Sequence, residues 1–178
     1  LLMRTSKAAM DEISHAKAAF SITEGFLGHP FSPGEFHMKL QSAKSLPEFA
    51  VNVAMEGAVN ETLAVVLATL QHDKCEDYAI KKFLTEIIKE EAEHAELAWE
   101  TLRWLIDIGG EEVIDALWEL TQRDFVPDVS SFPVVGIPSH GVISQTMAFS
   151  ALQNAYQYVV IPNLKIVLEE KMVQLAVS

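Results

Sequence analysis

Hydrophobic residues recur at intervals of three and four along most of this chain, which is the spacing that places them on one face of an α-helix. No stretch shows the alternation of hydrophobic and polar residues that is typical of a strand. The chain has 178 residues, a usual length for one domain, and we predict an all-α fold with a single domain over residues 1–178. The predicted helices cover residues 2–26, 47–71, 77–108, 111–123 and 144–173.

Proline and glycine mark the expected helix ends. Gly28 and Pro30 predict the end of the first helix, and Pro47 fits the first turn of the second. Gly109 and its neighbour Gly110 predict the end of the third helix. Pro162 lies inside the last helix, where a missing N–H and a bulky ring predict a kink or a break.

Two ten-residue segments carry the same polar pattern inside predicted helices. Both read acid-Glu-x-x-His-Ala-x-x-Ala-aromatic, and their offset is 79 residues (91 minus 12). Residues three apart are neighbours on one face of a helix. The pair Glu12 and His15, and likewise the pair Glu91 and His94, can therefore present one carboxylate and one imidazole to a common point.

The second pair lies in the apolar stripe of its helix. Glu91 and His94 align with Leu84, Ile88 and Ala98, not with the charged residues of the opposite side. Burying an ionised carboxylate without a partner costs roughly several kcal/mol. A divalent cation would neutralise the carboxylate and accept a neutral imidazole nitrogen. The repeat therefore predicts a metal site, and the alternative is that the histidines are ordinary core or surface residues.

A bundle that holds two metals between two Glu-x-x-His helices takes one further Glu from each of two other helices. Helix 47–71 offers Glu56 and Glu61. The position half-way between Glu56 and Glu91 is 73.5, inside the predicted turn, whereas that for Glu61 is 76, at the edge of the turn. We therefore prefer Glu56 as the ligand, with Glu61 as its neighbour or an additional ligand. The predicted metal-binding residues are Glu12, His15, Glu56, Glu61, Glu91 and His94.

The same interval predicts a further helix that carries a Glu. Glu56 precedes Glu91 by 35 positions, and 35 positions before Glu12 falls ahead of residue 1. The predicted site is thus one helix short. Either the sequence is a fragment of a longer chain, which the absence of an initial Met favours, or another subunit completes the bundle.

Composition narrows the possible partners. A net charge of -12 argues against binding to nucleic acid or to an anionic membrane surface. The apolar run 64–68 is far too short to span a bilayer. The single Cys75 cannot form an internal disulfide, so we expect a reducing, cytoplasmic compartment. Broad apolar helix faces predict a homo-oligomer.

These motifs resemble those of bacterial ferritin-like domain proteins of the di-iron carboxylate superfamily. The resemblance is carried by segments 11–16, 56–64 and 91–99, and Ser139-His140-Gly141 and segment 159–162 are similar to the end of such proteins. It implies a ferritin-like antiparallel helix bundle with extra C-terminal helices, and two iron or manganese ions bridged by carboxylates. Members typically begin with an extra helix bearing a Glu, which is missing from this chain.

The resemblance also implies a class of function. The first expectation is a di-iron oxidase or oxygenase that activates dioxygen or peroxide on a small-molecule substrate of unknown identity. The alternative is a metal-binding or iron-handling bundle without a catalytic cycle. A metal-free helical domain is the third possibility, and metal-dependent stabilisation would distinguish it from the other two.

Overall fold

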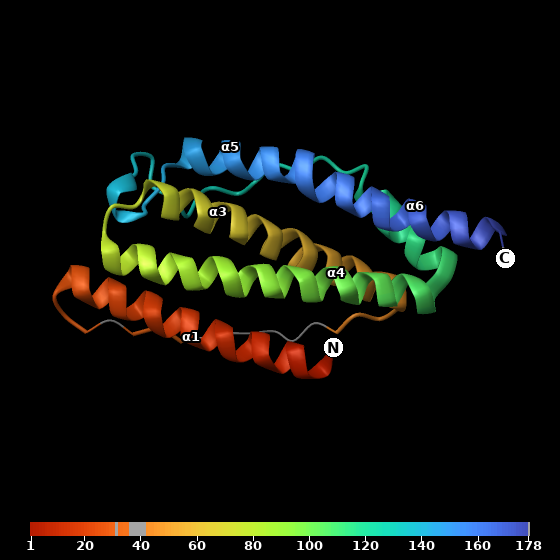
Figure 1. Ribbon diagram of the computed structural model, residues 1–178, viewed down its shortest axis with the longest axis horizontal. Helices are drawn as coiled ribbons and strands as arrows, with labels where there is room; N and C mark the ends of the chain where they lie inside the picture. Colours follow the sequence, from red (N-terminus) through yellow and green to blue (C-terminus); the bar gives the residue numbers. More distant parts are fainter. Residues whose placement is uncertain (31, 36–41, 178) are drawn as a thin grey trace. The chain divides into compact units, whose positions relative to one another are not determined.

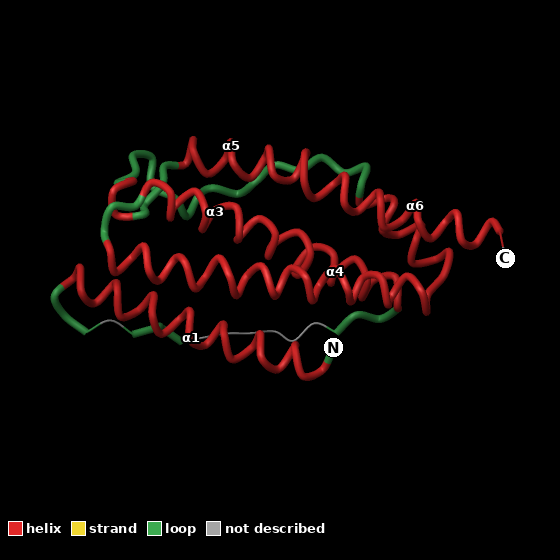
Figure 2. The backbone as a smooth tube through the Cα atoms, viewed as in Figure 1, coloured by secondary structure: helices red, strands yellow, loops and turns green. Residues whose placement is uncertain are grey.

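The computed structural model describes residues 1–30, 32–35 and 42–177, and within these ranges the chain consists of helices joined by loops (Figure 1, Figure 2). No strand forms among the described residues, although an isolated antiparallel bridge joins Ile137 and Val142. The all-α prediction is confirmed. The helical segments are α1 (Leu2–Leu27), α2 (Leu46–Asn52), η1 (Val53–Val59), α3 (Asn60–Lys74), α4 (Tyr78–Leu120), η2 (Pro138–His140), α5 (Gln145–Ala155), η3 (Tyr156–Val160) and α6 (Ile161–Val177).

By its internal contacts the chain divides into two compact units, Leu1–Ser42 and Ala43–Ser178. The first unit contains α1, whose bounds agree with the helix predicted over 2–26. The helix ends at Gly28, whose φ of 70° is a left-handed conformation that glycine adopts without steric cost. A single domain over residues 1–178 stays a prediction.

In the second unit, α2, η1 and α3 follow one another without interruption and contain the predicted helix 47–71. Two hydrogen bonds of the Glu48 residue close the N-terminus of this helix. The Ser45 hydroxyl accepts the N–H of Glu48 at 3.3 Å, and the Glu48 carboxylate accepts the N–H of Lys44 at 2.8 Å. The first bond satisfies a backbone donor that the first turn leaves without a helical partner, and the second connects the residue before the N-cap to the helix.

The middle of this helix, η1, is a π-helix, which the sequence pattern did not predict. The N–H of Asn60, the residue after η1, reaches the carbonyl of Met55, five residues earlier. A π turn is wider than an α turn and shifts the angular positions of the residues on either side of it. Glu56 lies inside η1 and Glu61 lies after it, so their relative directions differ from those on a regular α-helix.

The long helix α4 begins at Asp77 and is interrupted near its end. The Asp77 carboxylate accepts two backbone N–H groups of the first turn at 2.9 and 3.0 Å. Gly110 then leaves the helical conformation with φ 56° and ψ -142°, so two helices meet at a kink. The helix boundary predicted at Gly109–Gly110 lies at this kink.

Pro162 does not end the last helix, which is π-helical just before this residue. The chain is helical without interruption from Gln145 to Val177, and the π-helical η3 lies just before Pro162. Proline lacks an N–H, and its ring displaces the carbonyl four residues earlier. A π turn accommodates both effects within a continuous helix.

The helices of the second unit enclose its apolar core. The helix formed by α2, η1 and α3 packs against α4 and also against the C-terminal helix of α5, η3 and α6 (Figure 1). Most of the fully buried large side chains belong to α4 and α6. They include Leu102, Leu105, Ile106, Leu117, Leu164 and Leu168.

The helix Leu46–Lys74 is long and apolar enough to cross a membrane, with a mean hydropathy of 1.4 over its most apolar window. Core helices of globular proteins satisfy the same criterion, and this helix supplies buried residues to all three apolar clusters of the unit. It also carries Glu56 and Glu61 within its length. The expectation that the protein has no membrane partner stays a prediction.

Gly57 allows η1 to approach α4 closely. A Cβ atom at position 57 would lie 2.7 Å from the Cβ of Ala98, too close for two carbon atoms. We expect Gly57→Ala to force the helices apart and to lower the free energy of unfolding by about 1–2 kcal/mol, overpacking outweighing the better helix propensity of alanine. Urea denaturation measures the change. Ala98→Gly should cost less stability in the Gly57→Ala protein than in the original protein, and equal costs would contradict a direct clash.

The buried phenol of Tyr156 makes the stability of the folded state depend on pH in the alkaline range. Burial raises the pKa of its phenol above the ordinary value of 10.0, an effect that Arg123 partly opposes. The folded state therefore retains a proton that the unfolded state releases, and stability falls as pH rises from 10.0 through the folded-state pKa. We expect Tyr156→Phe, which keeps the ring stacked on Phe125, to lose less stability than the original protein between about pH 9 and pH 11. Parallel unfolding curves would contradict this assignment.

Candidate metal site

Glu91 and His94 lie together on the buried side of α4. Each residue is 7% exposed, and Nδ1 of His94 lies 3.4 Å from Oε2 of Glu91. Ala95 and Ala98, the neighbouring positions on this side, are buried as well. The sequence analysis placed the pair in the apolar stripe, and the structure confirms this placement. A carboxylate and an imidazole are thus held side by side in a largely apolar interior.

Glu61 extends from α3 toward this pair. One ligand atom from each of Glu61, Glu91 and His94 lies within 4.8 Å of the other two. These three residues are called the Glu61 cluster below. The helices α3 and α4 pack extensively against each other. One turn before Glu61, the absence of a side chain at Gly57 allows η1 to approach Ala98 of α4 closely. The cluster therefore depends on the packing of two helices that belong to the same compact unit.

The chemistry of the Glu61 cluster fits a metal ion. Nitrogen and oxygen ligands lie roughly 2 Å from a bound transition metal, so ligands of one ion are up to about 4 Å apart. The ligand atoms of the Glu61 cluster lie within 4.8 Å of one another, so small side-chain rotations would bring them to that spacing. The carboxylate of buried Glu91 and that of half-buried Glu61 repel each other, and a divalent cation would remove this repulsion. These buried glutamate and histidine groups can hold a metal ion.

Glu56, the ligand that the turn geometry favoured, lies elsewhere. Its side chain is exposed, and its Oε2 accepts a hydrogen bond from Nδ2 of Asn60 at 3.3 Å. Counting residues from the turn assumes regular α-helices, whereas Glu56 lies inside the π-helical η1 and Glu61 lies after it. A role for Glu56 as a ligand stays a prediction, whereas Glu61 has the position expected of one.

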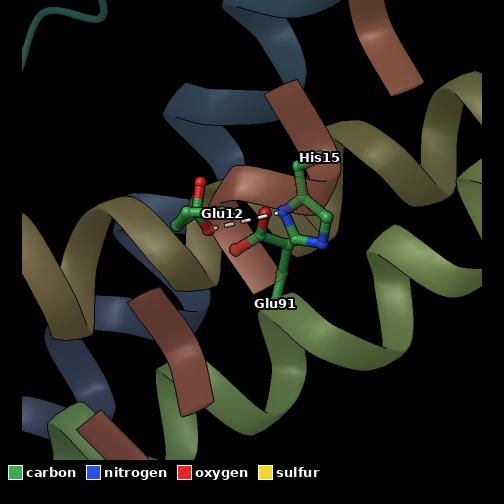
Figure 3. Close-up of side chains that lie close together, drawn as sticks. All are labelled: Glu12, His15 and Glu91. Carbon is green, nitrogen blue, oxygen red and sulfur yellow. Dashed lines mark ion pairs between the residues drawn. The ribbon is translucent and has the colours of Figure 1, made fainter. Parts of the chain in front are cut away.

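The first copy of the motif has the same local geometry as the second. In α1, Nδ1 of His15 lies 3.4 Å from Oε1 of Glu12, the ion pair marked in Figure 3. The His94–Glu91 pair in α4 joins the equivalent atoms at the same distance. Each Glu-x-x-His segment thus forms a helix that presents its carboxylate and imidazole together, as the spacing predicted.

Two contacts between α4 and the helix formed by α2, η1 and α3 were not predicted from the sequence. Trp99 was interpreted there only as a core or interface residue, yet its indole Nε1 donates a hydrogen bond to Oγ1 of Thr62 at 3.3 Å. Gly57 was not singled out either. A lone glycine inside a helix rich in Ala, Val and Leu was the available signal for a close helix contact.

Comparison with known proteins assigns no family. No protein-family model matches the chain, no curated protein matches it, and no solved structure matches it. What the structure supports is therefore an all-helical protein with a cluster of carboxylate and imidazole groups that can bind metal.

Binding of Mn(II) to single-site variants distinguishes Glu61 from Glu56. We expect Glu61→Gln to weaken Mn(II) binding about tenfold or more, because it removes a charged ligand from the cluster. Glu56→Gln makes the same chemical change on the same helix at an exposed position and should alter affinity less than about twofold. Calorimetric titration measures both. Loss of affinity in Glu56→Gln alone would restore the ligand that the sequence analysis preferred.

Proposed function

We propose that this protein is a ferritin-like di-metal carboxylate protein, most simply a di-iron oxidase or oxygenase. The Glu61 cluster is the observation that carries the proposal, because it combines the half-buried carboxylate of Glu61 with the buried carboxylate of Glu91 and the buried imidazole of His94. Mixed oxygen and nitrogen donors of this kind suit iron and manganese. Bound iron would supply redox chemistry toward dioxygen or peroxide.

The second half of the site is assigned to Glu12 and His15 by the repeat. Their sequence pattern and their 3.4 Å contact match those of Glu91 and His94. In di-metal bundles, two Glu-x-x-His helices each serve one side of the metal pair. We therefore propose that α1 contributes the ligands of a second metal ion.

The roles of the residues follow from their charges. Glu61 and Glu91 would neutralise a divalent cation, and His94 would bind it through a neutral imidazole nitrogen. The apolar residues around Glu91 would limit access of water and strengthen these electrostatic interactions. The substrate in this proposal is a small molecule, in keeping with a net charge of -12 that disfavours nucleic acid. A cytoplasmic homo-oligomer remains part of the proposal.

A metal-handling role without a catalytic cycle is the second candidate. A cavity of about 180 Å³ is lined by residues of α4 and α6, and none of them belongs to the Glu61 cluster. A substrate held in that cavity would not contact the proposed ligands directly. The lining residues are Arg103, Ile106, Asp107, Val167, Glu170 and Lys171.

Metal stoichiometry tests the di-metal proposal. We expect two Fe(II) ions per chain under anaerobic conditions, and one after the combined substitutions Glu12→Gln and His15→Gln, because these remove one set of ligands. Elemental analysis of the desalted protein measures the content. Two ions in both proteins would show that α1 supplies no ligand, and no bound iron in the original protein would overturn the proposal.

Oxygen consumption separates the two candidate functions. An oxidase or oxygenase takes up no more than its two ions per chain and consumes dioxygen again with each addition of reductant. Iron uptake well beyond two ions per chain, with dioxygen consumed only in proportion to iron added, would instead identify iron handling.

A further inference from the structure

A chain of two hydrogen bonds connects α4 to the end of η1. Nε1 of Trp99 donates to Oγ1 of Thr62 at 3.3 Å, and Oγ1 of Thr62 donates to the carbonyl of Ala58 at 2.6 Å. An indole N–H can only donate and a carbonyl can only accept, so the Thr62 hydroxyl must accept the first bond and donate the second. The orientation of this hydroxyl is therefore determined at both ends.

These two hydrogen bonds involve residues close to Glu61 in the helix. Glu61 is the one member of its cluster on α3, whereas Glu91 and His94 share α4. Rotation of α3 about its axis would move the Glu61 carboxylate away from the other two groups. Thr62 follows Glu61 directly, and Ala58 belongs to the π-helical turn just before it.

Trp99 can resist such a rotation. It lies on α4, the helix that carries Glu91 and His94, and its hydrogen bond reaches the residue next to Glu61. Its ring also packs against the main apolar cluster of the unit, which restricts its movement. The hydrogen bond from Trp99 therefore connects a rigid part of α4 to the turn that carries Glu61.

We infer that Thr62 and Trp99 are positioning residues that hold the Glu61 carboxylate in the geometry required for metal binding. The inference rests on the proposed function, because it concerns the affinity of the same cluster for a metal. Groups that orient a metal ligand without touching the metal typically change affinity 10–100-fold when removed.

Thr62→Val tests this inference in the full chain with Mn(II) as the probe. Valine has nearly the shape of threonine but no hydroxyl, so we expect Mn(II) affinity to fall about tenfold, whereas Thr62→Ser should remain within about twofold of the original protein. Trp99→Phe should show a similar loss, and the combination of Thr62→Val with Trp99→Phe should lose little more than either change alone. Calorimetry gives the affinities, and urea unfolding without metal reports stability separately.

Thr69→Val is the matched control. The Thr69 hydroxyl donates to the carbonyl of Val65 at 2.7 Å on the same helix, with the four-residue spacing seen at Thr62. Its removal should leave Mn(II) affinity unchanged. A loss equal to that of Thr62→Val would show a general effect on the helix and would overturn the inference.

The outcomes separate this inference from the proposed function. Suppose that the original protein binds Mn(II), that Glu61→Gln weakens this binding and that Thr62→Val leaves it unchanged. The positioning role would then be wrong, and the proposed metal site would stand. If Thr62→Val weakens binding equally in the Glu61→Gln background, its effect does not pass through Glu61 and the inference again fails. If the original protein binds no Mn(II), both proposals fall together.

Discussion

Repulsion between the buried carboxylate of Glu91 and the nearby, half-buried carboxylate of Glu61 is the constraint on which this account depends. Glu91 is almost fully buried, and Glu61 lies close enough for its carboxylate to interact with Glu91 and His94. Proteins rarely bury acidic groups unless a partner compensates the loss of hydration. A divalent cation would compensate both carboxylates at once and would also use the imidazole. Binding of a cation would explain why Glu61, Glu91 and His94 lie together between α3 and α4. The apolar residues around them would strengthen their electrostatic interactions.

The fold supports this cluster through local departures from regular helix geometry. The π-helix η1 contains the exposed Glu56 and ends two residues before the half-buried Glu61. Gly57 brings the backbone of η1 against Ala98, and the Thr62–Trp99 hydrogen bond joins the same two helices nearby. π turns are frequent at functional sites because they redirect side chains without ending the helix. The concentration of such features around Glu61 indicates that its direction is specified by the fold.

Much of the helical architecture could be predicted from hydrophobic spacing and from glycine and proline. The end of α1 at Gly28 and the kink at Gly110 were both expected from glycine positions. The repeated Glu-x-x-His spacing correctly placed each carboxylate beside its imidazole, because that contact depends only on helix geometry within a few residues.

The different surroundings of Glu56 and Glu61 could not be predicted from the sequence. They depend on the angular register between two helices, and a single π-helical segment changes that register without any clear signal in the residue pattern. The hydrogen bond from Trp99 to Thr62 could not be predicted either, because it joins residues 37 positions apart on two different helices. Tertiary contacts of this kind follow from how helices rotate against one another, which hydrophobic periodicity leaves undetermined.

Anomalous X-ray scattering from crystals of the manganese-loaded protein tests the central claim most directly, because it locates metal ions independently of activity. The account predicts a strong peak within coordination distance of Glu61, Glu91 and His94, accompanied by a second peak about 3.5–4 Å away. Anomalous peaks only at other positions, with the side chains of Glu91 and His94 hydrogen-bonded to protein groups alone, would contradict it.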